Sequence, residues 1–128
     1  MKEIQIDFVE NGAEYDDVIW DFWVIATLKD GLKIKLFDYQ GLDLRHLEGC
    51  RIKANIKALF IQTKKNTQLL FFKGIVSHDN KGYIFKSDNI DIVVNELDII
   101  VQKIPLNTKD AFYFGRLDLK DFELITEV

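Results

Sequence analysis

Cysteine, proline, histidine and serine are all scarce in this chain of 128 residues, which has one cysteine (Cys50), one proline, two histidines and two serines. A single cysteine cannot form an internal disulfide, and with His46 and His78 it does not supply the three or four ligands of a zinc site. Nucleophilic catalysis needs Ser, Cys or Thr beside a base, and the adjacent pair Ser77-His78 would point to opposite faces of a strand. Glycine-rich phosphate loops are also missing. The sequence therefore predicts no catalytic set, no metal site, no cofactor and no enzyme activity.

Long apolar runs are missing as well. No run approaches the ~20 residues needed to span a bilayer, and residues 1–8 lack the apolar segment of a signal peptide. With only one cysteine, we expect a cytoplasmic protein without a membrane partner.

Alternation of apolar and polar residues runs along the whole chain. It predicts strands at residues 4–8, 18–28, 32–37, 51–61, 69–76, 83–86, 90–94, 97–104, 111–117 and 122–126. Lys29-Asp30-Gly31 and residues 78–82 are typical of hairpin turns. The spacing of Leu44 and Leu47, followed by Gly49, indicates one short helix.

Many strands without intervening long helices favour a barrel or a sandwich. Long strands, one short helix and glycines inside strands (Gly74 and Gly115) are typical of a small antiparallel barrel of the OB type, with a β-sandwich as the alternative. The likeness is one of architecture and involves no family motif. The length and the ordinary hydrophobic fraction of 48% predict a single β domain over residues 1–128.

Charge is distributed unevenly along the chain, whose net charge is −4. Residues 1–21 carry one base and seven acids, residues 22–87 carry twelve bases and five acids, and residues 88–128 carry four bases and nine acids. A basic middle segment therefore lies between acidic ends. Two explanations stay open: ordinary solvation of exposed faces, or contact with an anionic partner.

Two of the predicted strands carry the basic residues on one face. This face also includes one polar and one aromatic residue. Its members are Lys33, Lys35 and Phe37 on the first strand and Arg51, Lys53, Asn55 and Lys57 on the second. If the strands are neighbours, they form a basic stripe with an aromatic end, which is typical of single-stranded nucleic-acid binding. The alternatives are a solvated face, protection of edge strands by lysine, and neutralisation by the acidic ends.

Trp23 is the candidate aromatic for a protein interface. In a strand, Trp20 and Phe22 would share the core, and Trp23 would lie on the other face. Exposed tryptophan is frequent at interfaces, but a neighbouring segment that covers Trp23 is an equal alternative.

The leading hypothesis is a non-enzymatic binding module that acts through protein contact, such as an adaptor, an inhibitor or an immunity-type protein. Acidic ends suited to a basic partner motivate it. The alternatives are a single-stranded nucleic-acid-binding domain that uses the basic stripe, and a small-ligand-binding barrel with an aromatic-lined pocket. A free strand edge would also allow a homodimer.

Overall fold

The computed structural model describes residues 1–19 and 21–125. The strands of the first part of the chain are β1 (Lys2–Asn11), β2 (Glu14–Tyr15), β3 (Val18–Ile19), β4 (Phe22–Thr27), β5 (Lys33–Asp38) and β6 (Arg51–Ala58), with the 3-10 turn η1 (Arg45–Leu47) before β6. The remaining elements are β7 (Ile61–Gln62), β8 (Leu70–Asp79), β9 (Gly82–Lys86), β10 (Asp91–Val94), α1 (Glu96–Val101), β11 (Lys109–Phe114) and β12 (Leu117–Leu124). No helix in these described ranges is long and apolar enough to cross a membrane.

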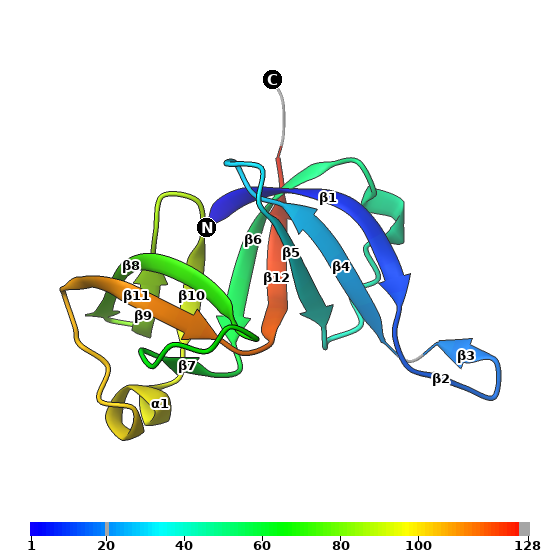
Figure 1. Cartoon of the computed structure of the whole chain (residues 1–128). Coiled ribbons are helices and arrows are strands. Elements are labelled where there is room, and N and C mark those ends of the chain that lie inside the picture. Colours follow the sequence, from blue (N-terminus) through cyan, green and yellow to red (C-terminus); the bar gives the residue numbers. More distant parts are fainter. Residues whose placement is uncertain (20, 126–128) are drawn as a thin grey trace.

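Five strands close into a barrel in the order β1-β4-β5-β12-β6, and β6 pairs back onto β1 (Figure 1). Along the chain, β12 is the fifth and last barrel strand. In the barrel it lies between the third strand, β5, and the fourth, β6, as the last strand of an OB barrel does. The pairing of β5 with β12 is parallel, and the other barrel pairings are antiparallel. The structure thus confirms a mainly β fold with a small OB-like barrel and a short helical turn before the fourth barrel strand.

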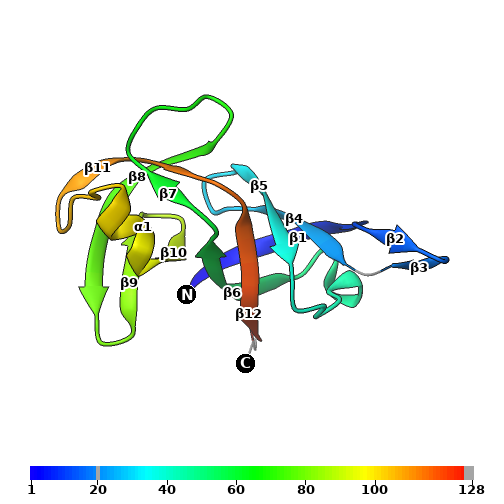
Figure 2. The ribbon, with the colours of Figure 1, turned by 90° about the horizontal axis from the view of Figure 1, so that it is seen from below.

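The segment between β6 and β12 builds a second β lobe that the sequence did not predict. Its strands continue the sheet in the order β6-β10-β9-β8-β11-β7, and α1 packs beside β7 (Figures 1 and 2). Since β6 runs into β7 and β11 runs into β12, both lobes share one long antiparallel ribbon. Backbone hydrogen bonds from Leu59 N to Arg116 O (2.8 Å) and from Gly115 N to Phe60 O (3.0 Å) continue it between the strands.

The buried side chains of both lobes form one contiguous apolar cluster. In the barrel, alternation places residues such as Val24, Leu36 and Ile56 inside. In the second lobe, the ring of Phe85 lies 5.6 Å from that of Phe112 and 5.0 Å from that of Phe114. Apolar burial on this scale is the main stabilising contribution to such a fold.

Several strand predictions were wrong. The strand expected over residues 51–61 is divided into β6 and β7, and the last strand begins at Leu117 rather than at residue 122. The single strand expected over residues 18–28 is divided into β3 and β4, and Val18 is half exposed; the prediction that Trp20 lies in the core falls outside the described residues. The strand expected over residues 97–104 is instead α1 followed by a turn. The reason is local, because the side chain of Asn95 accepts a hydrogen bond from Leu97 N (2.9 Å) and caps the helix.

The hairpin of β2 and β3 projects away from the barrel (Figure 2). Its tip residues Asp16 and Asp17 have φ values of 52° and 63°, in the left-handed region that Asp tolerates better than most residues. At its base, Gly12 N donates to Asp21 O (2.9 Å) and Ala13 N donates to the Asp21 carboxylate (2.6 Å).

Gly74 lets β8 pass close to β9. A Cβ at this position would lie 2.3 Å from the Lys86 carbonyl oxygen and 2.6 Å from Cζ of Phe85. We therefore expect Gly74→Ala to lower the free energy of unfolding by about 2 kcal/mol, because backbone and a buried ring would both have to move. Urea unfolding monitored by circular dichroism measures the change, and Lys73→Ala on the exposed side of the same strand serves as control. Equal stability of the two variants would contradict this account of the close approach.

Candidate functional site

The predicted basic stripe is interrupted in the folded barrel. Alternation was read correctly on each strand, because Lys33, Lys35, Arg51, Lys53 and Lys57 are exposed, and Phe37 and Asn55 are partly buried. The strands themselves, however, are not neighbours, since β12 lies between β5 and β6. The condition on which a continuous basic stripe depended is therefore not met, because the C-terminal strand closes the barrel at this position.

Acidic residues from both ends of the chain lie among these cations. Along β12, Asp118 is opposite Lys57, and Glu123 is opposite Lys53. Asp121 accepts a hydrogen bond of 3.4 Å from the amide of Asn55. These acids lower the net charge along the stripe, although no described carboxylate lies within 4.0 Å of the amine of Lys53 or Lys57.

The acids of β1 pair with the lysines of β5. Lys33 Nζ lies 3.0 Å from the Asp7 carboxylate, and Lys35 Nζ lies 3.3 Å from that of Glu10. The Thr27 hydroxyl donates to Asp7 (2.5 Å), and this bond, followed by the one from Lys33, lowers the pKa of Asp7 below its ordinary value of 3.8. These two lysines thus already have partners on the outer surface of the barrel.

Trp23 lies partly buried in a row of stacked side chains. Its ring is 4.9 Å from that of Phe37, and Lys35 Nζ lies 4.8 Å from its centroid. The guanidinium of Arg116 covers Phe37 at 4.4 Å and is held by the Asp118 carboxylate at 2.7 Å. Neighbouring side chains therefore cover much of Trp23, and its role at a protein interface stays a prediction.

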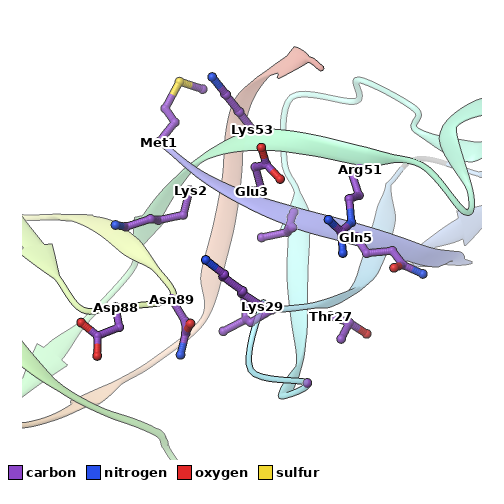
Figure 3. Close-up of a pocket in the computed structure, with 13 residues that line it drawn as sticks. Met1, Lys2, Glu3, Gln5, Thr27, Lys29, Arg51, Lys53, Asp88 and Asn89 are labelled. Carbon is purple, nitrogen blue, oxygen red and sulfur yellow. The ribbon is translucent and has the colours of Figure 1, made fainter. Parts of the chain in front are cut away.

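Cations that have no ion-pair partner in the described part of the chain gather at a different place, around a hollow of about 590 Å³ beside the start of β1 (Figure 3). Lys2 comes from β1, Lys29 from the turn between β4 and β5, and Arg51 and Lys53 from β6. Asp88 and Asn89, in the loop between β9 and β10, also line the hollow. We call this hollow and its four cations the basic cleft.

A change of strand partners in β1 creates the basic cleft. Gln5 is the last β1 residue opposite β6, where it faces Arg51, and the first opposite β4, where it faces Thr27. The residues before Gln5 therefore continue past the end of β4 and leave space next to the β4–β5 turn. Gly31, with φ of +90°, allows that turn to be tight.

The electrostatics of the basic cleft favour an anion. Among the described residues, no carboxylate lies within 4.0 Å of the charged nitrogens of Lys2, Lys29, Arg51 or Lys53. The lining contains two acids, Glu3 and Asp88. Cations that lack an internal partner and surround one concave surface raise the local concentration of anions.

Metal-ligating side chains do not gather into a site in the part of the chain that the structure describes. The ring of His78 lies beside that of Tyr83, with centroids 4.6 Å apart and planes tilted by 48°, and Cys50 is exposed. No group of three metal-ligating side chains occurs among the residues that the structure describes. The basic cleft is also without aromatic lining, which the small-ligand alternative requires. The lining of the basic cleft is instead dominated by charged side chains, four basic and two acidic.

Comparison with protein-family models, with curated proteins and with solved structures finds no match for this chain.

The sequence identified half of the basic cleft. Arg51 and Lys53 were singled out by their alternation on one strand, and they keep their positive charge unpaired in the described structure. Lys2 and Lys29 were missed because they come from two other segments of the chain, and no local pattern relates them to β6. Only the partner change of β1 brings these residues together.

The pKa of Asp7 tests the charge pairing on the barrel surface. We expect Thr27→Val to raise this pKa, because the hydroxyl bond is the largest single cause of its depression, and Lys33→Met, which removes a hydrogen bond and a positive charge, to raise it as well. The ionised Asp7 stabilises the folded protein above its unfolded pKa, and this contribution is lost as the pH falls through the lower folded value. NMR titration of the side-chain carboxyl carbon measures both variants. An unchanged pKa in Thr27→Val would contradict the assignment.

Proposed function

We propose that the protein is a non-enzymatic module that binds single-stranded nucleic acid through the basic cleft. The observation that carries this proposal is the gathering of four cations without an ion-pair partner among the described residues around one hollow, in a chain whose net charge is −4. Positive charge is therefore concentrated at the cleft, although the chain as a whole is acidic. The exposed lone Cys50 suits a reducing compartment, and cytoplasmic location belongs to the same proposal.

A chain-like anion fits the basic cleft better than a compact one. The four cations come from three separate elements, and their side chains lie around the opening rather than converging on one point (Figure 3). A phosphodiester backbone presents charges at intervals and would satisfy cations spaced in this way. The OB-like barrel adds support, because barrels of this architecture frequently bind oligonucleotides.

Release of counterions sets the expected salt dependence. Each phosphate contact with a single strand contributes about −0.7 to the slope of log affinity against log salt concentration. If each cation of the basic cleft contacts one phosphate, the affinity should fall by roughly 50-fold between 50 and 200 mM salt.

A charge-neutral double variant tests the cleft. Lys29→Gln with Arg51→Gln should weaken binding of a fluorescein-labelled dT20 about 10-fold, because two phosphate contacts are lost. The slope of log affinity against log salt should become shallower by roughly 1.4. Fluorescence anisotropy titrations at several salt concentrations measure both effects.

The matched control is Lys64→Gln with Lys65→Gln, which removes the same charge from the exposed loop before β8. Equal loss of affinity in the control would show nonspecific attraction and would contradict the proposal, as would failure of the wild-type protein to bind dT20 at low salt. Stronger binding of poly-glutamate than of dT20 would indicate an acidic protein partner instead.

The second candidate is protein contact through the projecting β2–β3 hairpin. Glu14, Asp16 and Asp17 are exposed there beside Tyr15, whose exposed fraction is 68%. A large aromatic surrounded by acids, on an element that projects from the body, suits a basic protein surface. This candidate corresponds to the leading hypothesis from the sequence, a module that uses its acidic ends to contact a basic protein.

Removal of the tip charges without loss of the turn tests this candidate. Asp16→Asn with Asp17→Gly keeps a sequence that favours left-handed φ values at both positions. We expect this variant to lose proteins that the wild-type chain captures from a lysate of its native cell, with quantitative mass spectrometry as the readout. Asp30→Asn in the β4–β5 turn is the control. Unchanged capture by the Asp16/Asp17 variant would remove the hairpin as the contact surface.

A further inference from the structure

The outer face of the second lobe carries a row of lysines. Ile75 on β8 is opposite Lys109 on β11 and opposite Lys86 on β9, so these two lysines lie on either side of it. Lys73 lies two residues before Ile75 on the same face. All three lysines are exposed, and within the described residues none has a carboxylate within 4.0 Å of its amine. Together they border a hollow of about 280 Å³.

Two aromatic rings extend this face along the same strands. Phe71 on β8 is opposite Tyr113 on β11, and the ring centroids lie 5.2 Å apart. Phe71 remains 42% exposed although it lies within a paired strand, and Tyr113 is partly buried beside it. An exposed, supported ring next to lysines provides both elements of single-strand recognition: a stacking surface for bases and cations for phosphates.

This face is continuous with the basic cleft. Asp88 lines both hollows, and the residues just before it, Lys86 and Ser87, line the smaller one. In the view of Figure 3, Asp88 and Asn89 lie at the lower left of the lining residues, below Lys2. A chain that leaves the cleft over the β9–β10 loop would therefore reach the lysine row directly. Two acids lie beside this path: Asp88, and Asp91, which is opposite Lys86 and pairs with the N-terminal amine at 3.7 Å.

We propose that Phe71, Tyr113, Lys73, Lys86 and Lys109 form a second subsite for the same nucleic-acid strand. This inference rests on the proposed function and deepens it, because it specifies an unpaired strand long enough to reach both lobes. Bases of a duplex are stacked within the helix and cannot lie on Phe71. The basic cleft holds phosphates, whereas the second subsite holds phosphates and stacks at least one base.

Length-dependent binding tests the second subsite. Phe71→Ala should weaken binding of dT20 about 10-fold, within the range known for loss of one stacked base. It should leave binding of dT4 at the basic cleft unchanged. The dT20·dA20 duplex should bind wild-type protein more weakly than dT20 does. Val101→Ala, which truncates an exposed apolar side chain on α1, is the control and should leave both affinities unchanged.

A second measurement uses the unaltered protein. Photo-cross-linking with dT20 that contains 5-iodo-deoxyuridine should yield adducts at Phe71 or Tyr113, located by mass spectrometry. Unchanged dT20 affinity in Phe71→Ala, or adducts confined to other aromatic residues, would overturn the second subsite. If binding still depends on Lys29 and Arg51 in that case, the proposed function stands alone. Failure of wild-type protein to bind any oligonucleotide would overturn both.

Discussion

The two lobes depend on one antiparallel ribbon, made by β6 and β7 on one side and by β11 and β12 on the other. One edge of β6 pairs with β12, and the other edge pairs first with β1 and then with β10. Its inward residues, Ile52, Ala54, Ile56 and Ala58, are all buried. Because β6 contributes to both lobes, it fixes where the start of β1 lies relative to the β9–β10 loop. Those two segments, the β4–β5 turn and β6 form the basic cleft.

Much of the fold could be predicted from local patterns, and the arrangement of its strands could not. Alternation identified the inward residues of β5 and β6, and Asp30-Gly31 identified the turn before β5. Strand order depends instead on pairings between distant segments, such as Leu117 with Leu36, for which alternation carries no information. The helix α1 was missed because residues 97–101 are rich in β-branched and apolar side chains, and the capping amide of Asn95 outweighs that preference.

Pairings between distant segments also decide which residues of the predicted basic stripe can form a site. The sequence located positive charge on the correct faces, but the charge that stays free depends on which acids fold against it. Lys33 and Lys35 are paired with Asp7 and Glu10 of β1, whereas Arg51 is opposite the neutral Gln5. Lys53 is opposite Glu3 of β1 and Glu123 of β12, yet its amine lies more than 4.0 Å from every described carboxylate. Which charges stay free therefore depends on the strand register and on the directions that the side chains take. For this reason the proposed interface moves from the stripe on β5 and β6 to the cleft beside β1.

Mapping of bound oligonucleotide by NMR tests this account most directly. Isotope-labelled protein titrated with dT12 should show its largest backbone amide shifts at residues 1–5, 28–31, 51–53 and 86–89, where the cations of the described structure are free. The paired surface of β4 and β5 around Trp23 should shift little. Largest shifts over that surface or over the β2–β3 hairpin, or no shifts anywhere, would contradict the claim that the unpaired cations of the basic cleft bind the strand.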